Sequence, residues 1–296
     1  MSGEISEFSS QNLSIVLGFI CSIFSLIGAL FTIIIYWLVP TTRKNFFFFL
    51  AFHLAISDFG VAITGMTLVD PHELNKTFCS VIATFRGFSI MSSFIINLMI
   101  ALFLYKAIQT NNYLQGFPNQ KLTFIISNYS FSLFGSIGPL LSGVYGPSNI
   151  YCWISTDEKR YISTFWLICE AYLALPLTLI WVTMIYCWII SHLKRMVAQE
   201  RQSDVNKLAM VPLLFVVANG ITFLDIVVDA FFGKQMTIKI IHTCLRQMQG
   251  FFHAIVYASG IVKEEIHNKI NEIKQKRKLS AESHLDYYSD KTNHNL

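Results

Sequence analysis

Charged residues are scarce in this chain. Only 14% of its 296 residues are Asp, Glu, Lys or Arg, whereas 53% are hydrophobic; a soluble globular protein usually carries about a quarter charged residues. Residues 8–42 contain no charged side chain at all, and such a run is long enough to cross a bilayer. The composition excludes a soluble enzyme, a disordered tail and a disulfide-dense secreted module.

Signals of several other protein classes are missing as well. The N-terminus carries Glu4 and Glu7 but no basic region before its first apolar run, which argues against a cleaved signal peptide. No phosphate-loop or nucleophile-elbow glycine motif occurs. We therefore expect a membrane protein whose first apolar run is its own insertion signal.

The charge-poor runs predict seven membrane-spanning helices, because they are about twenty residues or longer and do not alternate as barrel strands do. The predicted spans are residues 13–38, 46–69, 79–106, 121–144, 161–193, 207–231 and 237–260. The prediction is an all-α membrane protein with four parts. These are a short N-terminus (1–12), a seven-helix bundle (13–260), an amphipathic juxtamembrane helix (261–279) and a polar tail (280–296).

The distribution of Lys and Arg orients these spans. With the N-terminus outside, fifteen of the 22 basic residues fall on the cytoplasmic side and five on the outer side. The glycosylation acceptors at Asn12 and Asn75 both fall outside, whereas a third acceptor, at Asn128, lies within a span and should be unused. We expect a multi-pass plasma-membrane protein with a cytoplasmic C-terminus. Its excess of basic residues reflects this topology and is not a nucleic-acid footprint.

Two of the six cysteines lie at the predicted outer surface. Cys79 begins the third span, and Cys152 lies in the loop between the fourth and fifth spans. Because that compartment is oxidising, we predict a disulfide that holds this loop over the bundle, with two free thiols as the alternative. The other four cysteines fall within spans and are expected to act as small apolar residues.

Small residues form a face on the first span and are frequent in the fourth. Small residues let membrane helices approach closely, so we interpret these patterns as packing surfaces without chemistry. The residues concerned are Ser14, Gly18, Cys21, Ser25, Gly28 and Thr32 in the first span, and Ser127, Ser130, Ser132, Gly135, Ser136 and Gly138 in the fourth.

Ionisable residues within the spans gather in the outer half of the bundle. Such groups are costly in lipid and usually face the bundle interior. One interpretation is a polar cavity that binds a small extracellular ligand; the other is that the charges only pair with one another. The candidate ligand-binding residues are Arg86, Ser93, Asn97, Glu170, Asp225, Asp229, His242, Arg246 and Gln249.

Two further residues are candidate elements of a conformational switch. Asp58 lies near the midplane of the second span, either as a hydration or ion site or as a lone carboxyl kept protonated. Pro212 is expected to kink the sixth span and let it swing outward.

The spacing of the residues does not match known catalytic, cofactor or metal sites. A retinal protein needs a Lys in the middle of the seventh span, but Lys239 lies at its outer edge. His242 and His253 share a helix face yet lie about 16 Å apart along the axis, too far for one zinc ion. Spans 1–3 and 5–7 show no internal repeat of the transporter kind. We predict no enzyme, no cofactor and no metal, with a transporter or channel as the rival hypothesis.

The predicted cytoplasmic face is basic. Val262, Ile266, Ile270 and Ile273 repeat at helical spacing, which predicts an amphipathic helix along the inner membrane surface and contacts with its lipids. Basic residues before Ser280 make it a candidate phosphorylation site. The candidate docking residues for a partner are Arg43, Lys44, Lys194, Arg195, Arg201 and Lys207.

Four short motifs are similar to those of known receptors. Leu54-Ala-Ile-Ser-Asp58, Cys152-Trp-Ile154 and Val211-Pro-Leu-Leu-Phe-Val-Val217 resemble the slime-mould cyclic-AMP receptors and their cyclic-AMP-receptor-like relatives. Gln249-Gly-Phe-Phe-His-Ala-Ile-Val-Tyr257 is similar to that family and, distantly, to secretin and adhesion receptors. The signatures of rhodopsin-like receptors are missing: the third span ends in Leu104-Tyr-Lys106, and the seventh has no Asn-Pro-x-x-Tyr.

The resemblance implies a G-protein-coupled receptor that binds an extracellular small molecule and activates a heterotrimeric G protein. The chain departs from the slime-mould receptors in the sixth span. It has Ala218-Asn219 where they carry Cys-Trp, and Asp225-Ile226 where they carry Asn-Arg. The exchange of an Arg for an apolar residue beside a new carboxylate argues against a phosphate ligand at that point.

Overall fold

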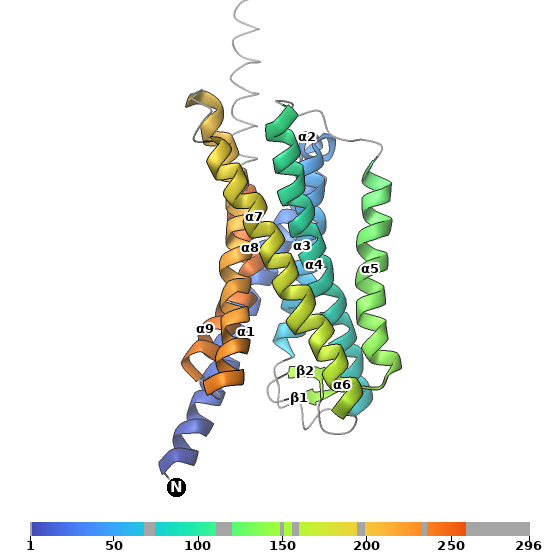
Figure 1. Cartoon of the computed structure of the whole chain (residues 1–296), viewed down its shortest axis with the longest axis vertical. Helices are drawn as coiled ribbons and strands as arrows, with labels where there is room; N and C mark the ends of the chain where they lie inside the picture. Colours follow the sequence, from blue (N-terminus) through green and yellow to red (C-terminus); the bar gives the residue numbers. More distant parts are fainter. Residues whose placement is uncertain are drawn as a thin grey trace, which may run out of the picture. The chain divides into compact units, whose positions relative to one another are not determined.

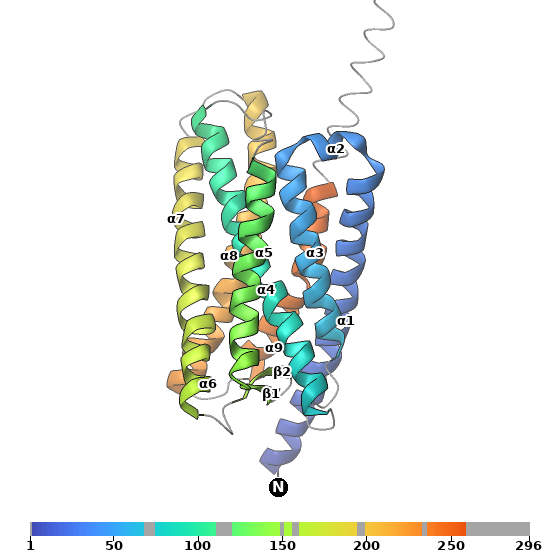
Figure 2. The same ribbon diagram turned by 90° about the vertical axis from the view of Figure 1, so that its right-hand side faces the viewer.

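The chain forms a bundle of long helices in a computed structural model that describes residues 2–67, 75–110, 120–148, 151–155, 160–193, 199–232 and 236–258. The helices run alongside one another, and a short hairpin lies at the end of the bundle where α1 begins (Figures 1 and 2). The elements are α1 (Ser2–Leu38), α2 (Pro40–Lys44), α3 (Phe46–Met66), α4 (Lys76–Thr110), α5 (Lys121–Leu141), β1 (Tyr145–Ser148), β2 (Tyr151–Ile154), α6 (Arg160–Leu167), the π-helical segment η2 (Ile168–Ala174), α7 (Leu175–Leu193), α8 (Gln199–Phe232) and α9 (Met236–Gln247).

Seven helical spans are present in the described part of the chain, as the sequence predicts. Six are long and apolar enough to cross a membrane as single stretches: Leu13–Leu38, Phe46–Met66, Lys76–Lys106, Lys121–Leu141, Tyr161–His192 and Met210–Val228. The seventh is not one continuous helix, because a turn at Met248 separates α9 from a second helical segment at residues 249–258. The seven-helix fold is confirmed, and the expectation of an unbroken seventh helix is corrected.

The outward-facing surface of the bundle is apolar. On α5, Phe131, Phe134 and Leu141 are 69%, 76% and 82% exposed, and large apolar side chains are exposed along α1 and α7 as well. Soluble proteins rarely expose such a continuous apolar surface to water, whereas an apolar surface is suited to the hydrocarbon core of a bilayer. The chain is therefore a multi-pass membrane protein.

The small-residue face of α1 is a packing surface, as predicted. All six of its small residues are buried, and the helix packs against α3 and α9. On α5 only part of the predicted pattern is inside: Ser132 and Ser136 are buried, but Ser127 and Ser130 are exposed. High Ser and Gly content in the fourth span therefore does not define one packing face.

Two predicted boundaries move outward in the structure. The predicted loop 194–207 is helical from Gln199 onward, where α8 begins, and the predicted N-terminal segment 1–12 continues α1 from Ser2. Both segments are polar, so a prediction based on hydropathy makes the two helices too short at their N-terminal ends. Good helix formers such as Gln199 and Glu200 extend α8 beyond its apolar part.

The fifth span contains a π-helical segment. The segment η2, between α6 and α7, ends two residues before Pro176. Proline has no backbone N–H to donate to the preceding turn, and a π turn accommodates the interrupted hydrogen bonding. Glu170 lies within this irregular segment.

The strands β1 and β2 form an antiparallel hairpin that pairs Tyr145 with Ile154 and Pro147 with Cys152. A disulfide joins Cys152 to Cys79 near the start of α4. Ser80 Oγ donates to Tyr145 O at 3.1 Å, which fixes the hairpin further. Gly143, with φ of 66°, makes the turn from α5 into β1, since other residues rarely adopt this conformation.

Candidate functional site

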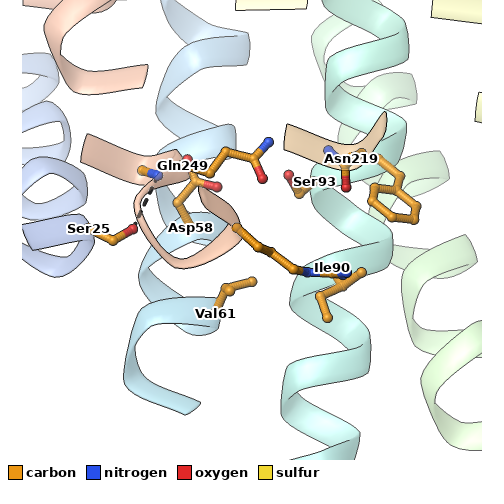
Figure 3. A pocket seen from close by; sticks show the side chains of 10 residues that line it. Ser25, Asp58, Val61, Ile90, Ser93, Asn219 and Gln249 are labelled. Carbon is orange, nitrogen blue, oxygen red and sulfur yellow. Dashed lines mark hydrogen bonds between the residues drawn. The ribbon is translucent and has the colours of Figure 1, made fainter. Parts of the chain in front are cut away.

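A polar cavity lies between α1, α3, α4, α8 and the seventh span. The free space inside it is about 10 Å³, enough for about one water molecule. Figure 3 shows Asp58, Ser93, Asn219 and Gln249 pointing toward one another across it. Its lining residues are Ser25, Asp58, Val61, Ile90, Ser93, Phe94, Asn219, Arg246, Gln249 and Gly250.

Asp58 is directly linked to the seventh span. Its Oδ2 lies 2.7 Å from Nδ1 of His253, and the two residues are only 3% and 7% exposed. Asp58 is therefore not a lone carboxyl, which removes that alternative. The pair connects α3 to the segment 249–258 next to the turn at Met248.

Hydrogen bonds between hydroxyl and amide groups hold α3, α4 and α5 together beside the cavity. Ser57 Oγ donates to Ser92 Oγ at 2.8 Å, and Asn128 Nδ2 donates to the same oxygen at 2.9 Å. His53 Nδ1 lies 2.7 Å from the hydroxyl of Tyr129. Asn128 is fully buried, so its acceptor motif is not accessible to a glycosyltransferase.

A second ionisable pair lies between α8 and α9, outside the cavity. Nδ1 of His242 lies 2.9 Å from Oδ2 of Asp225, and both side chains are less than one fifth exposed. Arg246, one turn further along α9, lines the cavity. Arg86 and Arg246 both act electrostatically on His242, so charged residues of α4, α8 and α9 gather beside the cavity.

Glu170 forms a third group, on η2. It is 7% exposed, and neither of its carboxyl oxygens has a hydrogen-bond partner among the described residues. Burial and then the nearby Glu170 raise the pKa of Tyr145 on the hairpin, so its phenol stays protonated. An added Cβ at Gly87 would lie 2.9 Å from the Tyr145 hydroxyl, which shows how closely the hairpin packs on α4.

The structure groups only some of the predicted ligand-binding residues. Ser93, Arg246 and Gln249 line the cavity together with Asp58. Arg86 and Asn97 are buried on α4 but are not among its lining residues. The side chain of Asp229 lies outside the described part of the structure.

Other predicted functional residues lie near the ends of the spans. Asn75 is exposed just before α4, where its Oδ1 accepts from Thr77 N at 3.0 Å. Arg43 is exposed on α2, and Pro212 is buried within α8. The remaining predicted residues lie outside the described part of the structure. The structure does not describe the side chains of Asn12, Lys44, Arg201 and Lys207. It also does not describe Lys194, Arg195, Ser280 or the predicted amphipathic helix 261–279.

Six of the ten lining residues were not among the predicted site residues; three of them, Val61, Ile90 and Phe94, are apolar. Ser25 belongs to the face of α1 that was interpreted as packing alone, and Gly250 carries no side-chain signal. Asn219 follows Pro212 by seven residues, two turns along the same helix face. The amide itself was the signal that could have identified this residue, because an amide within an apolar span needs a polar partner.

Replacing Glu170 with methionine should raise the free energy of unfolding by about 1–3 kcal/mol, because it removes a buried carboxyl that has no partner among the described residues. Titration with sodium dodecyl sulfate, followed by circular dichroism, measures the change. Glu170→Gln is the matched control, because its amide is equally buried and should gain less. A loss of stability in Glu170→Met would show that the carboxyl does have a partner.

The fold has a counterpart among solved structures. The crystal structure of squid rhodopsin aligns with a TM-score of 0.61 over 84% of this chain and 82% of that chain, at 16% sequence identity. No protein-family model matches the chain, and no curated protein matches it in sequence. The chain therefore has a rhodopsin-like seven-helix fold.

Proposed function

We propose that the chain is a cell-surface G-protein-coupled receptor of the cyclic-AMP-receptor-like type. The observation that carries this proposal is a polar cavity lined by five spans in a rhodopsin-like fold. Nε2 of Gln249 has no partner among the described residues, so this wall of the cavity has a donor to offer. An extracellular small molecule that binds two arrangements of these spans unequally shifts the population between them.

The proposed orientation places the hairpin outside the cell. Its support is the common location of three outer features: the beginning of α1, the hairpin with its disulfide, and the exposed Asn75 at the start of α4 (Figures 1 and 2). Arg43 on α2 lies at the opposite end of the bundle. This arrangement agrees with the excess of basic residues in the predicted cytoplasmic segments.

The ligand would bind in the cavity between the first, second, third, sixth and seventh spans; no described residue of the fifth span lines it. Arg246 and Gln249 would contact it from the cavity wall, and the Asp225–His242 pair would rearrange as it binds. On the cytoplasmic side, the basic residues at Arg43 and near the start of α8 would contact a heterotrimeric G protein. Cyclic AMP is a weak candidate ligand, because a carboxylate at position 225 repels a phosphate group.

Nucleotide exchange on purified heterotrimeric G proteins tests this function. The full chain is reconstituted in lipid vesicles and screened against cyclic AMP and a library of small extracellular metabolites. We expect at least one compound to accelerate exchange, and Arg246→Gln to raise its half-maximal concentration at least tenfold. The lipid-facing variant Ser130→Ala should leave that concentration unchanged. The absence of accelerated exchange with every G protein and compound would contradict the proposal.

A transporter is the second candidate function. The observation that favours it is the irregular turn at Met248 beside the buried Asp58–His253 pair, because ionisable residues within a membrane often mark substrate pathways. Uptake of labelled compounds into the same vesicles distinguishes the two functions. A transporter moves its substrate and leaves nucleotide exchange unchanged, whereas a receptor does the reverse.

A further inference from the structure

The first and seventh spans touch each other at their backbones. A Cβ added at Gly28 would lie 2.8 Å from the Cα of Phe251 and 2.9 Å from the carbonyl oxygen of Gly250. One turn nearer the N-terminus, Gly250 N donates to Ser25 Oγ at 3.2 Å. Such close packing is possible because both surfaces carry small residues.

The same register brings two cysteines together. The two spans run in the same direction, so a step of seven residues toward the N-terminus from Gly28 and Phe251 leads to Cys21 and Cys244 on the same faces. The helical hydrogen bonding continues across the turn, since Met248 N donates to Cys244 O and Phe252 N donates to Met248 O. The Cys21 and Cys244 thiols are near enough to act on each other electrostatically.

Both thiols are free, and they differ in exposure. Cys21 is buried and Cys244 is half-buried. Cys21 lies eight residues below Leu13, about 12 Å along the helix axis, and therefore in the outer half of the predicted span. A small uncharged oxidant reaches this depth from the extracellular side, whereas charged reductants of the cytosol do not.

We propose that Cys21 and Cys244 form a disulfide that ties α9 to α1 when peroxide is present. One thiol attacks hydrogen peroxide, which breaks the O–O bond, gives a sulfenic acid and releases one water. The second thiol attacks that sulfur, the S–S bond forms, and a second water leaves with the displaced oxygen. Two thiols and one peroxide thus give one disulfide and two waters.

This bond would restrain a segment that contacts two polar groups of the bundle. The helix α9 carries His242, which pairs with Asp225 on α8, and Arg246, which lines the cavity. With α9 tied to α1, the turn at Met248 is held from both sides, because Gly250 already bonds to Ser25. The modification does not depend on the receptor function proposed above.

Peptide mapping tests the proposal on the full chain in lipid vesicles. After treatment with hydrogen peroxide, free thiols are blocked with N-ethylmaleimide in detergent, and unreduced digests are analysed by mass spectrometry. We expect a Cys21–Cys244 linked peptide to rise at least tenfold and to disappear after dithiothreitol. The Cys79–Cys152 peptide is the internal reference, and Cys187→Ser is the control variant, which should leave the linked peptide unchanged.

Substitution of either thiol supplies the second measurement. Oxidation should raise the melting temperature of the parent chain, because the new cross-link restricts the unfolded chain. In Cys21→Ser, peroxide should give no linked peptide and no such rise. If peroxide leaves both thiols of the parent chain alkylatable, or oxidises them separately with no linked peptide, the proposal is wrong.

Discussion

Replacing His253 with alanine is expected to lower the free energy of unfolding by about 3–5 kcal/mol, the cost of removing one partner from a buried ionisable pair. The Asp58 carboxyl bonds to His253 at 2.7 Å and is 3% exposed, so truncation of the imidazole leaves this group buried without that bond. Titration with sodium dodecyl sulfate, monitored by circular dichroism, measures the loss.

A double-mutant cycle separates the pair from the cavity that the alanine creates. Asp58→Asn keeps an amide oxygen in the position of the carboxylate and removes the charge, so it should cost less than His253→Ala. The double variant Asp58→Asn/His253→Ala should be more stable than the sum of the two single losses predicts, because no buried carboxylate remains. Strict additivity of the two losses would contradict a direct interaction.

The helical spans and their packing faces were predictable because both depend on composition along one helix. Charge-poor runs located all seven spans, and helical spacing placed Ser14 and Thr32 on one buried face of α1. Lipid leaves the backbone little choice except the helix, so hydropathy is sufficient for this level of structure.

The grouping of the polar residues was not predictable from depth alone. Residues such as Glu170, Asp225 and Arg246 lie at similar depths, but a helix can turn any of them toward a different neighbour. Glu170 lies in a π-helical segment, and Gln249 directly follows the turn at Met248. Both irregularities arise from local hydrogen bonding, which hydrophobic periodicity does not report.

The environment of Asp58 could not be predicted, because the sequence does not identify its partner. A carboxyl near the middle of a span predicts a functional position, but its sequence neighbours do not identify His253, which is 195 residues away. The contact depends on the close approach of the seventh span to α1 and α3, where an added Cβ at Gly250 would lie 2.5 Å from Ser25 Oγ and 2.9 Å from Asp58 Cβ. A glycine at this position therefore allows the polar cavity to form.

Removal of the hairpin disulfide should cost about 4 kcal/mol, because Cys79 and Cys152 are separated by 73 residues and a cross-link of that length strongly restricts the unfolded chain. Cys79→Ser, Cys152→Ser and the double variant should lose the same stability, since each breaks the same bond. The exposed free thiol makes Cys187→Ser the matched control, with no expected change. Thermal unfolding in detergent, with and without reductant, measures these effects.

The disulfide also determines how firmly the hairpin covers the bundle. Without it, the antiparallel pairing of β1 with β2 and the bond from Ser80 to Tyr145 remain, but a two-stranded hairpin is only marginally stable by itself. Hydrogen exchange at residues 145–154 should therefore rise at least tenfold in Cys152→Ser, while exchange in α3 and α4 stays slow. Equal protection of the hairpin in the variant and the parent chain would show that packing on Ala83 and Trp166 is sufficient to hold it.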